Sequence, residues 1–426
     1  MGMTKNTFRN ASRRAGTALL GAGLALTAVP TAAAALTSPE RPPAAPGKKA
    51  DPRGTVVSAT RVAHMSGDEA GRYLTAISPD FGTPAPRHGV DTYRVVYRTI
   101  SATGAPTTAS GVVSLPARTA GRTLRAVSYA HGTHASRDMA GSVDEQGQSR
   151  VAAIYYAAAG YAGVAPDYLG LGLGPGHHPY MDAASEASAS LDMLRAARAV
   201  AASHGRVLNP RVLVTGFSQG GHAAMALGRE LQNGADRHLR LGALAPISGP
   251  YDIRDAQIPA SLSEDGPLAP RASVFYLSYV SVAWNRLHHI YDSPSQVFNA
   301  PHDKAVEGLF NGTTGEEEIV TRLPGTIREL ATPRYLRQLE HPSGALLRAI
   351  RSADGTCDWR PRVPVRIYGA SGDEHVAFAN ARSCARTLRA HGARPQVVDY
   401  GPDAGHDATV FKGLPDTLRW FQALGR

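Results

Sequence analysis

The chain has 426 residues, of which 43% are hydrophobic and 19% charged, an ordinary balance for a globular protein with a sizeable core. Its formal net charge is +10, yet the basic residues are spread along the chain. Zinc-finger spacing, a recognition-helix pattern and a basic tract interleaved with aromatic residues are all absent from the sequence. Composition therefore argues against a nucleic-acid partner and favours a mildly basic, solvated surface.

The first residues have the pattern of a targeting segment. Four basic residues and no acidic residue occupy the first 14 positions, an uncharged Ala/Leu/Gly-rich stretch follows at 15–29, and small residues fill 31–35. This order is typical of a secretory signal peptide. A membrane anchor needs about 20 apolar residues, more than this stretch offers. We expect residues 1–35 to be a signal peptide, and the remaining chain, with a net charge near +6, to be secreted into the extracellular space.

Residues 36–57 are dominated by proline and charge and contain no apolar face to bury. Such composition predicts a disordered leader. The remaining chain of about 370 residues exceeds a bare single domain. We therefore expect one core domain that carries a large insertion.

A mixed sheet is predicted along the core. Residues 92–99 alternate polar and apolar side chains, as a half-exposed strand does, and residues 109–115 follow as their antiparallel neighbour. Short apolar runs predict further strands at 124–130, 163–166, 212–215, 244–247, 363–368 and 396–400.

Helical patterns lie between and after these runs, at residues 150–159, 183–202, 220–232, 378–391 and 410–424. Strands that alternate with helices favour a mostly parallel sheet covered on both faces. The predicted fold is therefore α/β, with the plan of an α/β-hydrolase. Its core would span residues 58–251 and 342–426.

Residues 252–341 break this alternation, because helical patches recur there without a clear strand. The stretch at 273–290 is unusually apolar and aromatic. A structureless loop of this length would be improbable inside a compact domain. We expect a helical cap, inserted between two strands and seated over their carboxyl ends.

The most informative motif is Gly-Phe-Ser-Gln-Gly at residues 216–220, between a buried strand and a helical pattern. A G-x-S-x-G turn between strand and helix exposes its serine as a nucleophile, and the helix N-terminus favours a developing oxyanion. An ordinary turn with a helix-capping serine is the alternative. The strand before it and the helix after it favour Ser218 as the nucleophile.

The partners of Ser218 should follow in the order acid, then histidine. His406 stands on a Gly-rich loop between the last strand and the last helix, where it could act as the base. Asp373 follows the preceding strand and is the predicted acid. Glu374 is its competitor and Asp403 a distant one. His375, in the same loop, is expected at the surface.

An oxyanion needs two N–H donors. Gln219, directly after the nucleophile, is expected to supply one. The other should come from the loop after the strand that ends near residue 130, where Gly132 and Thr133 are both candidates. His131 is expected to shape this loop.

Cys357 and Cys384 are the only cysteines. In an exported chain such a pair predicts a disulfide, which would stabilise the fold by roughly 3 kcal/mol. Two buried thiols are the alternative, because sequence alone does not fix the distance between them. No set of metal ligands is evident, and we expect neither a metal nor a cofactor.

With these residues assigned, the chain resembles the secretory lipase family of α/β-hydrolases. The resemblance covers roughly residue 58 to the C-terminus. It rests on SYAHGT (128–133), GYAGVAPDYLGLG (160–172), SEASASLDMLRAAR (185–198), GFSQGGHAA (216–224), the Asp373 loop and GPDAGHD (401–407). In the Asp373 loop, Ala377 replaces the proline that often follows the valine in relatives.

The resemblance implies a secreted lipase or carboxylesterase that cleaves lipid or short-chain esters through an acyl-enzyme, without a cofactor, with a cap that binds the acyl chain. A serine peptidase with the same triad is the alternative, and a catalytically inactive binding protein is a third. A peptidase needs fixed charges in its pocket, for which the cap offers only scattered candidates such as Glu264 and Asp265. We expect a small-molecule or lipid ester as partner, at most transient contact with a lipid interface, and no obligate protein partner.

Overall fold

A computed structural model describes residues 52–82, 88–117 and 121–425. The predicted signal peptide lies outside the described residues, as does most of the predicted leader. The end of that leader is ordered, because β1 begins at Val56 and the Arg53 Nε donates to Asp192 Oδ2 over 2.9 Å. The expectation of disorder up to residue 57 is therefore wrong at its C-terminal end.

A nine-stranded sheet has the order β1-β2-β3-β6-β5-β8-β9-β10-β11. The pairs β1–β2, β2–β3 and β3–β6 are antiparallel, and every later pair is parallel. The predicted mixed, mostly parallel sheet is thus confirmed. Its strands are β1 (Val56–Met65), β2 (Val90–Ile100), β3 (Pro106–Pro116), β5 (Ala126–Ala130), β6 (Ala162–Pro166), β8 (Arg211–Phe217), β9 (Arg240–Ile247), β10 (Arg366–Gly369) and β11 (Gln396–Asp399). Two short strands, β4 (Thr123–Leu124) and β7 (Val207–Leu208), form a separate parallel pair.

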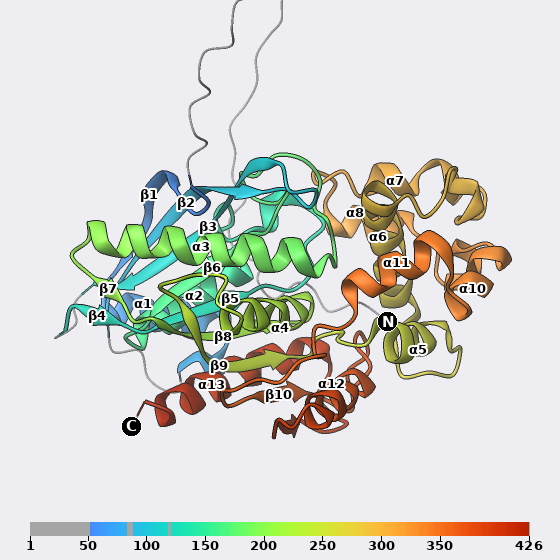
Figure 1. The fold of residues 1–426 in the computed structure, drawn as a ribbon. Helices are drawn as coiled ribbons and strands as arrows, with labels where there is room; N and C mark the ends of the chain where they lie inside the picture. The colour runs from blue at the N-terminus through green and yellow to red at the C-terminus, as the bar shows by residue number, and fades with distance from the viewer. Residues whose placement is uncertain (1–51, 83–87, 118–120, 426) are drawn as a thin grey trace, which may run out of the picture. The chain divides into compact units, whose positions relative to one another are not determined.

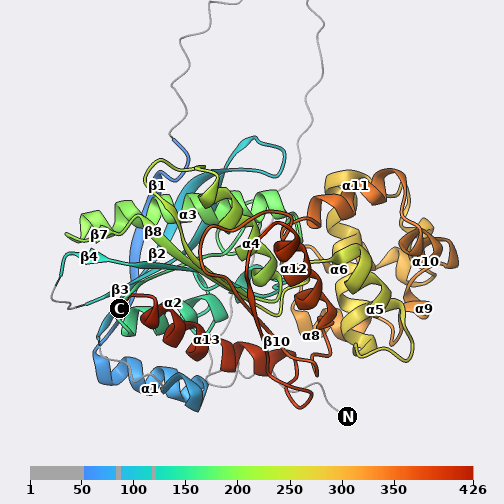
Figure 2. The ribbon, with the colours of Figure 1, turned by 60° about the horizontal axis from the view of Figure 1, so that its bottom comes forward.

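Helices cover both faces of the sheet (Figure 2). Every residue of β5 and β6 is buried, as expected for central strands packed between two helical layers. One layer consists of α3 (Ala183–Ser203), α4 (Gln219–Gln232) and α12 (Ala379–Ala390), and the other of α1 (Gly67–Ile77), α2 (Gln148–Ala158) and α13 (His406–Ala423).

Between β9 and β10 the chain forms a group of helices that we call the insert (Figure 1). The insert has an apolar cluster of its own, in which Val282 and Trp284 of its longest helix are almost fully buried. Its helices are α5 (Ile258–Leu262), α6 (Pro270–His288), α7 (Val306–Leu309), α8 (Glu316–Arg322), α9 (Ile327–Leu330), α10 (Pro333–Glu340) and α11 (Gly344–Ala353). The same cluster includes Ala353, so these helices continue past residue 341.

Short helical turns complete the described chain: η1 (Pro79–Gly82), η2 (Arg137–Met139), η3 (Ile253–Gln257), η4 (Pro294–Gln296) and η5 (His302–Lys304). The predicted disulfide between Cys357 and Cys384 is present and ties the segment after α11 to α12. Among the helices of the described chain, none is long and apolar enough to cross a membrane.

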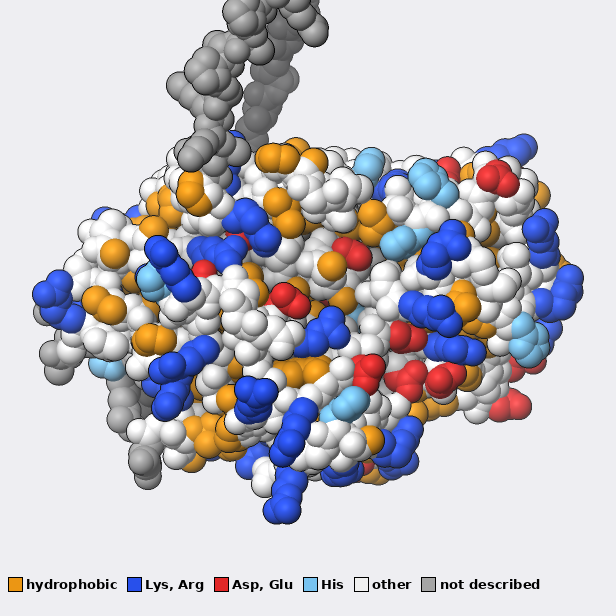
Figure 3. Space-filling view, viewed as in Figure 1, with side chains coloured by type: hydrophobic (Ala, Val, Ile, Leu, Met, Phe, Trp, Pro, Cys, Tyr) orange, Lys and Arg blue, Asp and Glu red, His pale blue; other side chains and the backbone are white. Residues whose placement is uncertain are grey.

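Basic side chains are scattered over the face shown in Figure 3, on the core and on the insert alike, while acidic side chains gather near its centre. On this face the chain therefore offers no continuous basic surface of the kind that tracks a phosphate backbone.

Candidate active site

Ser218 lies between the end of β8 and the start of α4, with φ 57° and ψ −122°. A non-glycine residue rarely adopts this backbone conformation, and such strain is typical of functional positions. The turn also requires glycine on either side. A Cβ on Gly216 would lie 2.1 Å from the Gly220 oxygen, and one on Gly220 would lie 1.9 Å from the Ala130 oxygen. This geometry is that of a nucleophile elbow.

Three side chains from distant parts of the sequence form a hydrogen-bonded chain at this turn. The Ser218 Oγ lies 3.0 Å from His406 Nε2, and His406 Nδ1 lies 2.8 Å and 2.9 Å from the two carboxylate oxygens of Asp373. All three residues are at most 4% exposed. When Nδ1–H donates to the carboxylate, Nε2 is left to accept the serine proton.

Opposing effects set the charges of this pair. Burial alone would lower the pKa of the His406 imidazole, but the charge and the hydrogen bond of Asp373 raise it above the ordinary value. Burial alone would raise the pKa of the Asp373 carboxyl, but His406 and the N–H groups of Val376 and His375 lower it. The carboxylate therefore stays ionised and can stabilise an imidazolium next to it.

The competing acids do not contact the imidazole. Glu374 Oε2 accepts a hydrogen bond from the backbone N–H of His406 over 2.9 Å, which fixes the start of α13. Asp403 is exposed. Of the three acids considered from the sequence, the structure places Asp373 on the His406 ring.

His375 does not lie on the open surface as expected. Its ring centroid is 4.8 Å from that of His406, and its Nδ1 lies 3.2 Å from the Tyr276 hydroxyl oxygen, within hydrogen-bond distance. Burial, together with the charge of His406, lowers the pKa of the His375 imidazole. The insert also binds the backbone oxygens of this loop. The Ala269 N–H donates to the Glu374 oxygen, and Gln257 Nε2 donates to the His375 oxygen.

The two candidate donors of the 131–133 loop differ. The Gly132 N–H donates to Gln148 Oε1 over 2.8 Å, so it is already engaged. The backbone N–H groups of Thr133 and Gln219 have no acceptor among the residues that the structure describes. Ala130 pairs with Gly216 in register, which places the Thr133 loop beside the elbow. Gln219 is also the first residue of the 14-residue α4, whose N-terminus favours negative charge.

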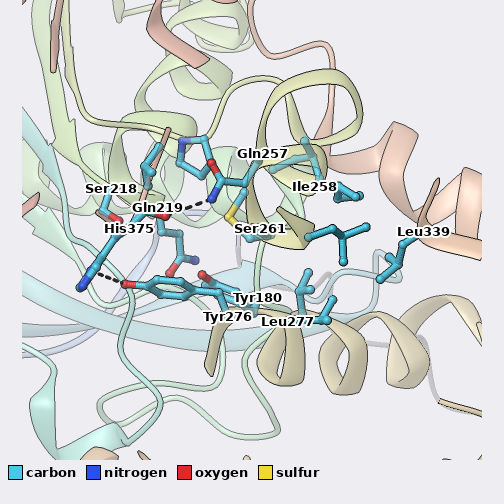
Figure 4. Close-up of a pocket in the computed structure, with 16 residues that line it drawn as sticks. Tyr180, Ser218, Gln219, Gln257, Ile258, Ser261, Tyr276, Leu277, Leu339 and His375 are labelled. Carbon is cyan, nitrogen blue, oxygen red and sulfur yellow. Dashed lines mark hydrogen bonds between the residues drawn. The ribbon is translucent and has the colours of Figure 1, made fainter. Parts of the chain in front are cut away.

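A pocket opens at Ser218 and holds about 670 Å³ of space free of protein atoms, including space open to solvent. Figure 4 shows Ser218, Gln219 and His375 towards one end and Leu339 towards the other. Most of the wall between them is apolar and comes from the insert, with side chains of Ile258, Leu262, Leu277 and Val280. Neither a carboxylate nor an ammonium or guanidinium group is among its lining residues.

Within the described ranges, no three His, Cys, Asp or Glu side chains cluster in a way that could hold a metal ion.

Comparison with known proteins gives structural relatives only, since neither a family model nor a curated protein matches the sequence. The rice cell wall degrading esterase LipA from Xanthomonas oryzae superposes with a TM-score of 0.78 at 27% identity, over 87% of this chain and 98% of that one. A protein from Legionella pneumophila superposes with a TM-score of 0.79 at 24% identity, over 87% and 98%. Candida antarctica lipase A in its closed state gives 0.64 at 17% identity, over 88% and 82%.

The chain has the α/β-hydrolase fold. The predicted resemblance to a lipase and esterase family of this fold is confirmed by the esterase LipA, which is 27% identical. The esterase LipA, at 27% identity, supports an ester-hydrolysing enzyme and does not favour the peptidase alternative. The Legionella pneumophila protein and Candida antarctica lipase A, at 24% and 17% identity, show the fold alone.

Proposed function

We propose that the protein is a secreted serine hydrolase that cleaves carboxylic esters through an acyl-enzyme on Ser218. The observation that carries this proposal is the chain of hydrogen bonds from the Ser218 hydroxyl through the His406 imidazole to the Asp373 carboxylate, at the end of an apolar pocket. Each group has a role in it: nucleophile, base and orienting acid.

In the first half-reaction, Ser218 Oγ attacks the ester carbonyl while its proton passes to His406 Nε2. The ionised Asp373 stabilises the imidazolium that results. The tetrahedral intermediate then collapses: the bond to the alcohol oxygen breaks, that oxygen takes the proton from Nε2, and the acyl group stays on Ser218.

In the second half-reaction, His406 removes a proton from water, and the resulting hydroxide attacks the acyl carbonyl. The bond to Ser218 Oγ breaks, and the serine regains its proton from Nε2. Both halves pass through an oxyanion, for which we assign the backbone N–H groups of Gln219 and Thr133 as donors. Such donors act through fixed position, and loss of one typically costs about 10² to 10³ in kcat.

The pocket supports esters in which at least one part of the molecule is apolar, such as short-chain or lipid esters. The insert supplies this apolar wall through α5, α6 and α10. We propose that it serves as a cap over the remaining core, which starts again after α11 and not at residue 342 as expected, and that contact with a lipid interface, where it occurs, is transient.

A peptidase would need a charged group in the pocket to hold a peptide terminus. Glu264 and Asp265, the acidic candidates from the sequence, are exposed and do not line the pocket. Glu264 pairs instead with Arg328 on the surface of the insert.

Export is supported by the disulfide, because such bonds persist in oxidising compartments. The signal-peptide pattern of residues 1–35 agrees with it.

The direct test measures the rate at which the purified protein hydrolyses p-nitrophenyl esters, from acetate to palmitate, and compares it with the rate on amino-acid anilides. We expect ester turnover, and a fall of about 10⁴-fold or more in Ser218→Ala. Ser278→Ala is the matched control, since Ser278 is buried on α6, bonds to the Val274 oxygen and does not line the pocket. Preference for anilides, or undiminished turnover in Ser218→Ala, would contradict the proposal.

A further inference from the structure

The loop of residues 131–137, which we call the oxyanion loop, is held by two different parts of the molecule. Its first half is held by the core. Tyr168 donates its hydroxyl proton to the His131 oxygen over 3.1 Å, and Gln148 accepts from the Gly132 N–H over 2.8 Å. Thr133 follows directly after this core-bound half.

The second half of the loop is held by the insert. The Tyr279 hydroxyl on α6 donates to the His134 oxygen over 3.1 Å, and Glu316 Oε1 on α8 accepts from the Ala135 N–H over 3.1 Å. The Arg137 N–H donates to the Gly312 oxygen over 2.9 Å. Contacts at His134, Ala135 and Arg137 thus tie the loop to the insert, which lies far away in sequence.

Tyr180 joins the two halves at Thr133. Its hydroxyl lies 2.9 Å from Thr133 Oγ1, and its ring stacks on Tyr279 with centroids 4.2 Å apart and planes 3° apart. Tyr279 in turn stacks on Phe310 of the insert at 4.7 Å. Tyr180 also lines the pocket, so this stack stands next to the reacting centre.

Tyr180 and Tyr279 are fixed in one position by burial and stacking. Tyr180 and Tyr279 are at most 4% exposed, and burial raises the pKa of both hydroxyls above the ordinary value. They therefore remain protonated and keep their hydrogen bonds at any pH at which the enzyme would work. Stacked rings have few alternative rotamers in a packed interior.

We infer that Tyr180 and Tyr279 are positioning residues for the Thr133 N–H, so that the insert completes the oxyanion site as well as the substrate pocket. The inference rests on the proposed function, in which Thr133 is the second oxyanion donor. An oxyanion donor acts only when it is about 2.7–3.1 Å from the charged oxygen. A small displacement of Thr133 therefore reduces the stabilisation of the transition state more than it reduces the affinity for the substrate.

The test compares Tyr180→Phe, Thr133→Val and the double variant on p-nitrophenyl butyrate. Each single change removes one of the two hydroxyl groups that form the hydrogen bond between Tyr180 and Thr133, and it leaves the Thr133 N–H in place. We expect kcat to fall about tenfold in each single variant, with KM changed less than about twofold, and no further fall in the double variant, because both changes break one contact. Tyr279→Phe is expected to lower kcat in the same manner.

A second readout separates positioning from general damage. An alkylboronic acid forms a tetrahedral adduct on the active serine and places an oxygen where the oxyanion forms. We expect its affinity to fall in parallel with kcat, about tenfold. Tyr335→Phe is the matched control, because Tyr335 loses a buried hydroxyl contact to Ser281 inside the insert without touching the loop; we expect it to change neither quantity.

Unchanged kcat and boronic acid affinity in Tyr180→Phe and Tyr279→Phe would overturn the inference. So would additive losses in the double variant, or equal losses in Tyr335→Phe. Failure of the proposed function would look different, since the wild-type protein would then show no Ser218-dependent ester turnover at all.

Discussion

The core and the insert meet at the same pocket, yet they hold their contributions by different means. At the elbow, Gly216 and Gly220 bring backbone against backbone so closely that no side chain fits. At the oxyanion loop, the insert acts through the Tyr279 hydroxyl and stacked rings. Any added atom disrupts the tight backbone packing of the elbow. Loss of one hydroxyl or one ring, in contrast, removes only part of the contacts between the insert and the loop. We therefore expect changes in the core to abolish turnover, and changes in the insert to adjust its rate and its substrate preference.

The largest effect is expected for Gly220→Ala in the core. The added Cβ would lie 1.9 Å from the oxygen and 2.4 Å from the carbonyl carbon of Ala130, so the elbow has to open. We expect loss of ester turnover to background and a destabilisation of about 3 kcal/mol or more, measured by hydrolysis assay and thermal unfolding. Gly71→Ala is the control, because its Cβ meets nothing within 4 Å in α1. It is expected to be neutral or stabilising by up to about 1 kcal/mol. Normal activity in Gly220→Ala would break the contrast between the two regions.

Asp373→Asn is expected to lower kcat about 10⁴-fold, since the amide no longer stabilises the imidazolium and favours the wrong tautomer. The pH profile gives the sign of the same interaction. His406 acts as a base only when it is neutral, and Asp373 raises its pKa, so wild-type kcat/KM falls as the pH drops through this raised pKa. In Asp373→Asn the acidic limb should move to lower pH. An unmoved limb in residual activity would assign the acid elsewhere.

The smallest and most selective effect is expected in the insert. Leu339 on α10 lines the far end of the pocket, so Leu339→Phe shortens the apolar space. We expect the ratio of palmitate to butyrate turnover to fall about tenfold, in line with a few methylene contacts. Leu336→Phe, on the same helix but outside the pocket lining, should leave the ratio unchanged. Equal losses on both esters would mean that the pocket does not measure chain length.

The sequence predicted the parts of this molecule that are specified locally or by chain order. The turn around Ser218 is recognisable because a buried strand and a helix flank it, and His406 and Asp373 follow from their places after the last strands. A capping box at Ser66 and Glu69 marks the start of α1 as well, although this helix was not among the predicted elements. The edge strand β1 was missed because most of its residues are exposed and no regular alternation marks them.

The sequence does not predict residues whose position depends on contacts between distant segments. Gln148 engages the Gly132 N–H from α2, a helix on the far side of an irregular loop. His375 contacts Tyr276 only because α6 packs against the loop that carries Asp373. Tyr180 and Tyr279 are separated by about a hundred positions, and nothing in their spacing indicates that they stack. Tertiary packing alone decides such positions.

The insert grips both sides of the reacting centre at once. It holds the oxyanion loop through Tyr279 and Glu316, and it holds the loop that carries Asp373 through Ala269 and Gln257. A rigid-body movement of the insert away from the core would break all of these hydrogen bonds together. It would expose the pocket, but it would also release the two loops that form the site. If these bonds are kept during turnover, an ester enters through small movements of side chains around the pocket mouth. We then expect hydrolysis of a sparingly soluble ester to saturate smoothly with its concentration, without a jump when droplets form.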